Sequence, residues 1–312
     1  MSAVPLRGKL AALVAIAAFV ATGCGSSGAD KDKKEGTTGK EPPLGELRQI
    51  RGPADVALPL DAYWPTTQDR ANSFRAVYLV GADCMRRFGS PDWPVPDMGP
   101  QAPTEGRNMR RYGVFLASDA ERYGYHSPDQ AAGQGAPPPP RTTRVPTPQE
   151  NQIWAGQIAQ TPDGRKVPTG GCSQESEDKI INGVPRAEFL NTVQNLMMES
   201  WTKVKTDSRA QAATAKWSEC MARSGYKYGD IWAAHDGNSG GPTATSKEIA
   251  VAKVDVACRQ ETNLTNLLFT IDAAYQNQSI EAHAEVLRKV KDYQDALKRG
   301  AAQILAGKPV SS

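Results

Sequence analysis

The sequence predicts a mainly α-helical domain that two disulfide bonds staple together and that carries long Pro/Gly-rich loops. Three observations favour this fold class. Apolar residues recur at three- and four-residue spacing over several long segments, four cysteines follow an export signal, and residues 91–171 are rich in proline and glycine. We expect this domain to occupy residues 61–308 of the 312-residue chain.

The N-terminus has the three parts of a bacterial secretory signal. Arg7 and Lys9 supply positive charge, and residues 10–20 (LAALVAIAAFV) form an apolar run that is shorter than the ~20 residues of a membrane-spanning helix. Residues 21–24 (ATGC) resemble the lipobox of bacterial lipoproteins, with Cys24 as its cysteine. In that family the cysteine sulfur receives a diacylglyceryl group, and the leader is cut just before it. The alternative is an ordinary secretion signal followed by an unrelated cysteine.

A flexible tether is predicted between the lipid and the folded domain. Residues 25–40 (GSSGADKDKKEGTTGK) are too polar to bury a core. We therefore assign residues 1–23 to the signal peptide and residues 24–60 to the lipidated N-terminus and its linker. Two acyl chains hold a protein stably at a membrane, whereas one chain holds it marginally. The expected location is the extracytoplasmic face of the cell membrane, with membrane lipid bound through Cys24.

The net charge does not indicate a nucleic-acid partner. Removing Arg7 and Lys9 with the leader reduces the 37 basic residues to 35, against 34 acidic residues, which leaves a net charge of +1. A nucleic-acid-binding domain is expected to show a strongly basic face. We therefore predict no nucleic-acid partner.

Cys84, Cys172, Cys220 and Cys258 remain once Cys24 is assigned to lipid. An even number of cysteines in an exported chain indicates disulfide bonds, and four cysteines allow three connectivities. Spacing alone does not choose among these connectivities. The sequence contains no C-x-x-C pair, so we interpret the cysteines as structural staples rather than redox groups.

The residues around the cysteines indicate a diverged internal duplication. Cys84 and Cys220 each begin C-M-x-R-x-G, whereas Cys172 and Cys258 each begin C-x-Q-E-[S/T]. Pairing like with like favours the bonds Cys84–Cys172 and Cys220–Cys258. Coincidence in short windows is the alternative, because the first unit carries a much longer insert. In the chain-entropy model each bond stabilises the fold by roughly 4 to 4.5 kcal/mol.

The first pseudo-repeat, at about residues 65–185, is expected to begin with a long helix over residues 69–88. The Pro/Gly-rich segment 91–171 then forms extended loops, interrupted by a short helix near residues 118–123. The apolar face of the long helix consists of Phe74, Val77, Tyr78, Gly81 and Cys84.

Helix signals also mark the second pseudo-repeat, at about residues 205–305. A helix is expected to begin near Pro185, just before this repeat. Asp207 or Ser208 is expected to cap the next helix, which Gly225 ends.

The C-terminal part of the sequence predicts long helices. From Thr243 to Arg299 there is neither glycine nor proline, and Ser246 is the expected N-cap. We interpret residues 243–305 as two long helices that bend near residues 277–279, with one continuous helix as the alternative.

Residues 237–242 (GNSGGP) resemble the loop around the nucleophilic serine of chymotrypsin-like proteases. This resemblance implies Ser239 as the nucleophile and the backbone amides of Gly237 and Ser239 as the oxyanion hole. Those enzymes are double β-barrels, whereas Ser239 lies between predicted helices. We also expect His235 to be too close in sequence to face Ser239 productively. A secreted serine hydrolase that uses Ser239 is therefore the alternative function, and we favour a protein that is not an enzyme.

No metal or cofactor site is predicted. His126, His235 and His283 lie far apart in sequence, and the cysteines are assigned to disulfide bonds. A zinc site requires clustered ligands, and a nucleotide site requires a phosphate-binding glycine loop after a strand. The sequence offers neither pattern.

Aromatic residues give a signal for binding, because tryptophan and tyrosine are enriched at interaction hot spots. We interpret most of them as loop packing, with Trp217 and Tyr226 against the disulfide of Cys220, and a surface groove as the alternative. The aromatic residues near the loops and cysteine motifs are Trp64, Trp93, Tyr112, Tyr123, Tyr125, Trp154, Trp217, Tyr226, Tyr228 and Trp232.

Several stretches together resemble a group of uncharacterised actinobacterial lipoproteins. The resemblance covers most of residues 65–275 and implies the location and the disulfide pattern, but no activity. We expect a non-catalytic, membrane-tethered protein that binds or scaffolds at the cell envelope, where a further envelope protein is its partner. The stretches are residues 82–85 (ADCM), 111–113 (RYG), 122–126 (RYGYH), 170–175 (GGCSQE) and 217–226 (WSECMARSGY).

Overall fold

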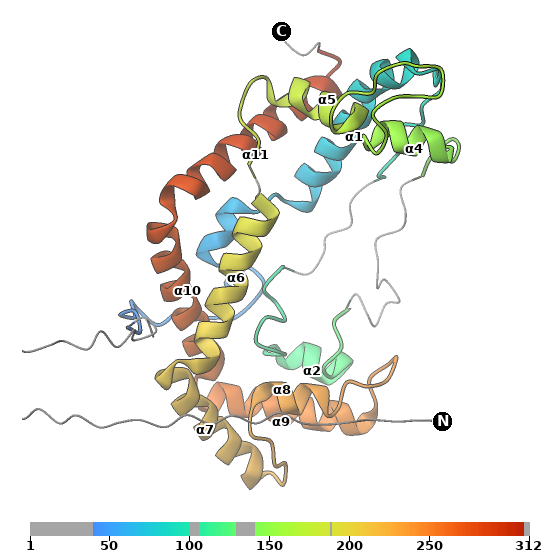
Figure 1. The fold of residues 1–312 in the computed structure, drawn as a ribbon. Helices are drawn as coiled ribbons and strands as arrows, with labels where there is room; N and C mark the ends of the chain where they lie inside the picture. Colours follow the sequence, from blue (N-terminus) through green and yellow to red (C-terminus); the bar gives the residue numbers. More distant parts are fainter. Residues whose placement is uncertain (1–39, 100–105, 129–140, 188, 309–312) are drawn as a thin grey trace, which may run out of the picture. The chain divides into compact units, whose positions relative to one another are not determined.

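The computed structural model describes residues 40–99, 106–128, 141–187 and 189–308 (Figure 1). Within these residues the secondary structure is helical, and β-structure is limited to isolated bridges. The predicted mainly α-helical class is therefore confirmed. The helices are η1 (Pro59–Tyr63), α1 (Thr67–Arg87), α2 (Ala117–Tyr123), α4 (Pro148–Trp154), α5 (Gly171–Ile181), α6 (Phe189–Thr206), α7 (Ser208–Arg223), α8 (Ile231–Asp236), α9 (Ser246–Glu261), α10 (Leu264–Ala282) and α11 (Ala284–Leu305).

The chain divides into two units, residues 1–40 and residues 41–312, and all of these helices belong to the second unit. The predicted signal peptide and the predicted lipid site at Cys24 lie outside the described residues.

The folded part of the chain begins earlier than we predicted. Residues 41–60, which we assigned to the flexible linker, pack along α10. The backbone N–H groups of Arg48 and Ile50 donate to side chains of α10 at 3.0 and 2.8 Å. The side chains of Val56, Leu58 and Leu60 are buried. A segment with buried side chains and fixed backbone hydrogen bonds is not a flexible linker, so the linker boundary at residue 60 is wrong.

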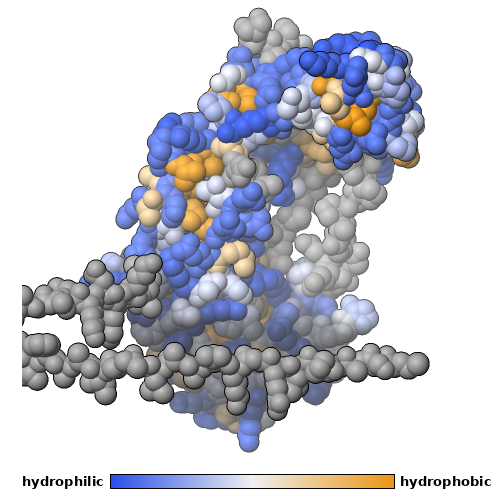
Figure 2. Space-filling model, viewed as in Figure 1, coloured by the Kyte–Doolittle hydropathy of each residue, from blue (hydrophilic) through white to orange (hydrophobic). Residues whose placement is uncertain are grey.

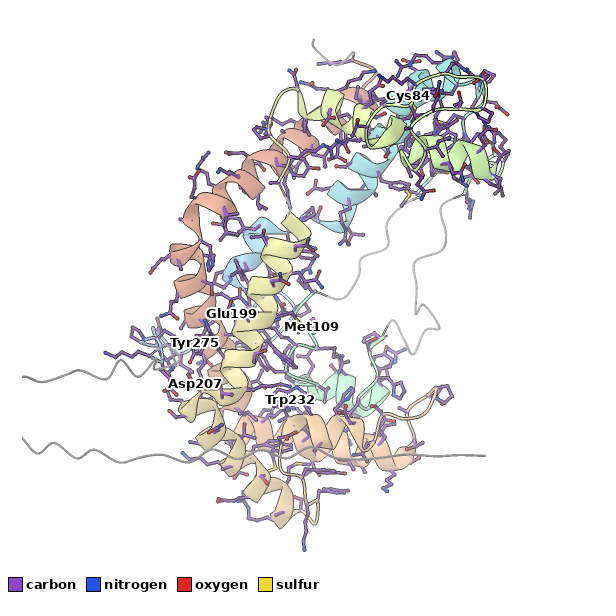
Figure 3. All side chains as sticks on the ribbon, in the orientation of Figure 1. Cys84, Met109, Glu199, Asp207, Trp232 and Tyr275 are labelled. Atoms are coloured by element: carbon purple, nitrogen blue, oxygen red, sulfur yellow. A yellow bond between two sulfur atoms is a disulfide. The ribbon has the colours of Figure 1, made fainter. Side chains whose placement is uncertain are left out.

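Capping side chains set where two helices of the second pseudo-repeat begin. Asp207, one of the two predicted caps of α7, accepts from the backbone N–H of Arg209 at 2.9 Å. Asp207 is buried and also accepts from the hydroxyl of Tyr275 on α10 at 3.1 Å (Figure 3). Thr245 caps α9, one residue before the predicted cap Ser246. Caps of this kind contribute about 1 kcal/mol each to stability.

Residues 243–305 form three helices, rather than the one or two that we predicted. The first break follows α9, where Asn263 adopts a φ of 58°, a left-handed conformation that asparagine tolerates. The second break is at His283, whose φ is −120°. The predicted bend near residues 277–279 is wrong, because these residues lie inside α10.

In the described residues of the Pro/Gly-rich segment, the structure has one more helix than we predicted. The short helix near residues 118–123 is confirmed as α2. The additional helix is α4, which begins at Pro148. Its capping box is reciprocal: Thr147 Oγ1 accepts from the Glu150 N–H at 3.2 Å, and the Glu150 carboxylate accepts from the Thr147 N–H at 2.7 Å.

Two disulfide bonds join helices in the pairing that the repeated motifs favour. Cys84 on α1 is bonded to Cys172 on α5, and Cys220 on α7 is bonded to Cys258 on α9. They enclose sequence separations of 88 and 38 residues. Each bond therefore holds together two helices that lie apart in the sequence.

The surroundings of the two bonds are alike, which supports a diverged duplication. In each pseudo-repeat the arginine of C-M-x-R pairs with the glutamate of C-x-Q-E across the disulfide bond. These pairs are Arg87 with Glu175 and Arg223 with Glu261. In each pseudo-repeat the helix that carries C-M-x-R, α1 or α7, is followed by a glycine with positive φ, as expected of a helix C-terminus. These glycines are Gly89 (φ 87°) and Gly225 (φ 88°).

The two pseudo-repeats are nevertheless interwoven rather than separate bodies. α2, which comes from the first repeat, packs on α9 of the second (Figure 1). α11, which comes from the second repeat, packs on α1 and α5 of the first. Each half therefore completes its packing with a helix from the other half.

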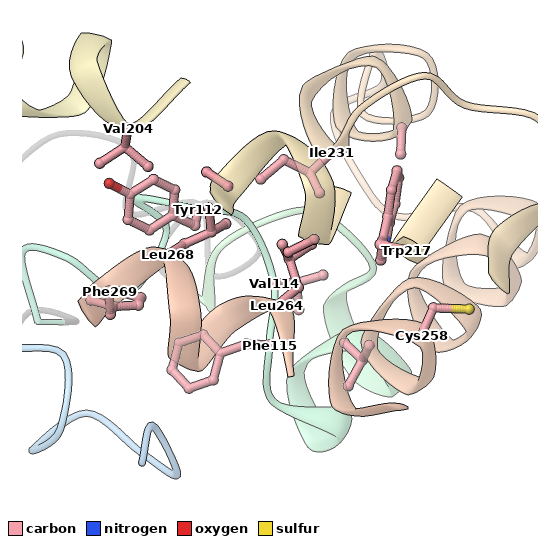
Figure 4. Packing of buried hydrophobic residues seen from close by; sticks show 14 of the residues in the cluster. Tyr112, Val114, Phe115, Val204, Trp217, Ile231, Cys258, Leu264, Leu268 and Phe269 are labelled. Atoms are coloured by element: carbon pink, nitrogen blue, oxygen red, sulfur yellow. The ribbon is translucent and has the colours of Figure 1, made fainter. Parts of the chain in front are cut away.

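The largest hydrophobic cluster lies where α7, α9 and α10 meet the loop before α2 (Figure 4). Tyr112, Val114 and Phe115 enter this cluster from the loop. Trp217 on α7 and Phe269 on α10 are fully buried beside them. The loop is therefore part of the core, although it contains little regular structure.

A buried ion pair lies inside this core. Arg259 Nε donates to Asp255 Oδ1 at 2.6 Å, and both side chains are at most 2% exposed. The indole of Trp217 and the hydroxyl of Tyr125 donate to the same carboxylate at 2.8 and 3.1 Å. Arg259 Nη1 donates to the carbonyl oxygen of Tyr112 at 2.5 Å. These contacts satisfy a charge pair that would otherwise be costly to bury.

The substitution Arg259→Met is expected to lower the free energy of unfolding by about 3–5 kcal/mol, because it leaves Asp255 buried without its cation. The matched control is Arg223→Met, whose partner Glu261 is as exposed as Arg223 itself (58% and 59%). This control substitution should lower the free energy of unfolding by less than about 1 kcal/mol. Urea unfolding with intact disulfide bonds measures both. Equal losses in the two variants would contradict the proposed importance of the buried pair.

Candidate functional site

A cavity of about 610 Å³ opens between α1, α11 and the chain around η1. We call it the aromatic cavity. This volume lies within the range of small-molecule binding pockets. The face drawn in Figure 2 is mostly hydrophilic, with separate apolar areas in orange, one of them where α1, α4 and α5 meet. The apolar walls of the cavity are Trp64, Phe74, Val77, Tyr78, Trp154 and Leu297.

Aromatic rings in contact with one another build the wall formed by α1 and α4. The Tyr78 ring lies 4.7 Å from the Phe74 ring and 4.5 Å from the Trp154 ring, centroid to centroid. Trp93 packs behind them, 4.9 Å from Trp154. Such contacts hold aromatic side chains in fixed orientations. The wall is therefore preorganised.

The first disulfide bond supports this wall. Cys84 and Cys172 belong to the same buried cluster as Trp93, with Tyr78 and Trp154 packed against it. Gly81 permits the close approach of α4 to α1, since a Cβ at this position would lie 2.3 Å from the ring of Trp154. A side chain at residue 81 would displace the wall.

Charged groups surround the mouth of the aromatic cavity, and most of them are paired. Asp69 binds Lys298 at 3.1 Å, and Asp295 binds Lys291 at 2.6 Å. Glu177 pairs with Arg186 at 2.7 Å and accepts a hydrogen bond from the hydroxyl of Tyr293. The rim is therefore polar around an apolar interior, which is typical of ligand sites.

A second hollow of about 580 Å³ shares Trp64 with the aromatic cavity. Arg107 lies over the Trp64 ring, with its guanidinium carbon 3.7 Å from the ring centroid. Arg110 and Arg111 also line this hollow, and their guanidinium groups pair with Asp119 and Asp272. The side of Trp64 that faces this hollow is therefore basic.

The serine of the GNSGGP motif lacks the geometry of a nucleophile. Ser239 Oγ lies 3.4 Å from His235 Nδ1, closer than we expected from the sequence. The same nitrogen faces Asp236 at 2.9 Å, whereas a catalytic triad uses the two ring nitrogens separately. The amides of Gly237 and Ser239 donate to the carbonyl oxygens of residues 233 and 235. They are therefore not directed at an oxyanion.

The motif instead forms a loop that His126 anchors. His126 Nε2 lies 2.8 Å from the carbonyl oxygen of Gly241, and its Nδ1 lies 2.8 Å from the carboxylate of Glu248. Because both partners are acceptors, the imidazole satisfies both only when both of its nitrogens are protonated. The hydrogen bond that His126 donates to the carbonyl oxygen of Gly241 raises the pKa of His126, as does Glu248, whereas burial and the charge of Arg110 oppose the increase.

Other predicted site residues are distributed as follows. Trp64 and Trp154 line the aromatic cavity, which is the surface hollow that we considered for the aromatic residues. Trp217 lies in the core cluster that contains Cys220 and Cys258. Among the described residues no group of three or more histidine, cysteine, aspartate or glutamate side chains is arranged to hold a metal ion. In the same part of the chain, no helix has the length and apolar character needed to cross a membrane.

The sequence signals for the site were incomplete. The sequence predicts one apolar helix face with Phe74, Val77 and Tyr78, but it does not predict that these residues line a cavity. Lys291 and Leu297 lie at the cavity because α11 packs on α1, and no local pattern in the sequence predicts this packing.

Comparison with protein-family models, curated proteins and solved structures gave no match to this chain.

The stability that His126 contributes is expected to depend on pH. The pKa of His126 is raised in the folded state above the ordinary histidine value of about 6.5. The stability that the protonated imidazole contributes is therefore complete below about pH 6.5 and is lost as the pH rises through the raised pKa. The loss of unfolding free energy caused by His126→Gln should therefore be largest in acid and should shrink as pH rises. Urea unfolding at several pH values measures it.

His235→Gln is the control, because the His235 side chain is 43% exposed and outside the core. Its effect should be small at each pH. A loss for His126→Gln that stays constant between about pH 5 and 9 would contradict the assignment of a protonated, buried imidazole.

Proposed function

We propose that this chain is a membrane-tethered lipoprotein of the extracytoplasmic face, whose helical domain binds a ligand or an envelope partner without a chemical reaction. The observation that carries the proposal is the aromatic cavity, with its apolar interior of about 610 Å³ and its polar rim. Cavities of this size and lining are the usual sites of small-molecule binding.

Binding is favoured over catalysis by the groups that surround the cavity. Asp69, Glu177 and Asp295 each have a cationic partner. A general acid or base needs a free group within hydrogen-bond reach of its substrate. The arrangement at Ser239 adds no support for the alternative of a serine hydrolase, since its amides bond within the loop.

An extracytoplasmic location is supported by two features. The described cysteines form two disulfide bonds, and such bonds persist in oxidising compartments. The N-terminal sequence has a positive segment, an apolar run and a lipobox-like site at Cys24. Lipid on Cys24 would hold the helical domain at the membrane surface.

Lipidation is tested by expressing the full chain in a bacterial host and extracting the membranes. Mass spectrometry of the N-terminal peptide is expected to find Cys24 as the first residue, with acyl groups attached. Cys24→Ser should abolish acylation, because the sulfur is the site of attachment. An unmodified Cys24 in the mature wild-type chain would contradict the tether.

Binding in the aromatic cavity is tested with N-phenyl-1-naphthylamine, a neutral aromatic probe whose fluorescence rises in apolar surroundings. The protein is the mature chain with Cys24→Ser, which keeps the other residues and removes the lipid. Phe74→Asp should weaken probe binding by about 10- to 100-fold, because burying a phenyl group contributes about 1.5–3 kcal/mol.

Leu79→Asp is the matched control. Phe74 and Leu79 both lie on α1 and are similarly exposed, at 39% and 37%, but only Phe74 lines the cavity. The control variant should bind the probe like the parent chain. Equal weakening by the two substitutions would show that the probe binds exposed apolar surface and would remove support for the cavity.

A further inference from the structure

Arg70 is a cation on the rim of the aromatic cavity for which the described residues offer no counter-charge. It lies in the first turn of α1, next to Asp69, and its side chain is exposed. The other cations of the rim, Lys291 and Lys298, each pair with a carboxylate. Arg70 makes no ion pair with any described residue.

Arg107 is a second guanidinium without an ion pair among the described residues, and it lies beside the cavity that Arg70 lines. It stacks on Trp64, which lines the aromatic cavity as well. Partial burial lowers the pKa of Arg107, and the charge of Arg70 lowers it further, while the charge of Asp61 opposes the decrease. Arg70 and Arg107 therefore both adjoin the part of the cavity lined by Trp64, and the charge of Arg70 acts on Arg107.

Asp61, whose charge acts on Arg107, is held elsewhere through one carboxylate oxygen, while its other oxygen is buried without a hydrogen-bond partner. One oxygen of the Asp61 carboxylate accepts from the backbone N–H of Leu58 at 2.8 Å and from the side-chain amide of Asn108 at 2.7 Å. Asp61 makes no ion pair with either arginine. A carboxylate or phosphate between the two guanidinium groups would remove their repulsion and form charge-assisted hydrogen bonds.

These charges adjoin an apolar cavity, so the chemistry of the occupant has two parts. Phe74, Tyr78 and Trp154 favour an apolar body, and the two arginines favour an anionic end. We propose that the aromatic cavity binds an anionic amphiphile, whose apolar part packs on these rings and whose carboxylate or phosphate lies between Arg70 and Arg107. This inference rests on the proposed binding function and specifies its ligand class.

The test compares ligands that share one chain length and differ in the head group. Dodecanoate, dodecyl phosphate and dodecanol, below their micelle-forming concentrations, compete with N-phenyl-1-naphthylamine for the mature chain with Cys24→Ser. The two anions should bind at least about tenfold more tightly than dodecanol. Inorganic phosphate alone should not displace the probe, because it lacks the apolar part.

The double variant Arg70→Gln/Arg107→Gln should lose the preference for anions while binding dodecanol as before. The control is Arg75→Gln/Arg299→Gln, which removes the same net charge from exposed residues of α1 and α11 outside the cavity lining. This control should keep the preference. Circular dichroism and urea unfolding verify that both variants fold.

The outcomes separate this inference from the proposed function. Equal binding of dodecanol and the anions by the parent chain would overturn the proposed preference for an anionic head group but leave the cavity as a binding site. A preference that survives in Arg70→Gln/Arg107→Gln, or is lost equally in the control, would overturn the assignment to these two arginines. Tight binding of inorganic phosphate alone would overturn the need for an apolar part. Failure of the probe and of dodecanol to bind would overturn the proposed function itself.

Discussion

The core of this protein depends on two buried carboxylates that a single tyrosine connects. The carbonyl oxygen of Tyr112 accepts from Arg259, which pairs with Asp255 on α9. The hydroxyl of Tyr112 donates to Asp272 on α10, where Arg111 also binds. A buried carboxylate without partners is costly. The loop around Tyr112 and both helices must therefore assemble together, which explains why a segment with little regular structure is buried.

Local signals in the sequence predicted the elements that depend on neighbouring residues. The cap at Asp207 and the helix end at Gly225 each involve residues only a few positions apart. The order in residues 41–60 was missed because the polar stretch before it dominated the composition, while the backbone bonds of this segment go to α10, more than 200 residues away. The break at His283 was missed because neither glycine nor proline marks it.

The aromatic cavity could be predicted only in part for the same reason. The helical spacing of Phe74, Val77 and Tyr78 placed them on one face, and this face exists. The spacing does not distinguish a face that packs against a neighbour from one that lines a hollow. That difference is set by α4, which adds Trp154, and by α11, which closes the opposite side. Both α4 and α11 reach the cavity through tertiary contacts, which local sequence patterns do not predict.

The surroundings of the two disulfide bonds are alike locally, but the tryptophans near them lie in different environments. Trp217 is fully buried, and its indole N–H donates to Asp255. Trp154 instead packs against Tyr78 and Trp93 and lines the cavity. An indole bound to a buried carboxylate helps to complete a core, whereas one held by other rings keeps apolar surface open. The long insert of the first unit, which supplies Trp93 and α4, therefore accounts for the cavity lying beside the first disulfide bond rather than the second.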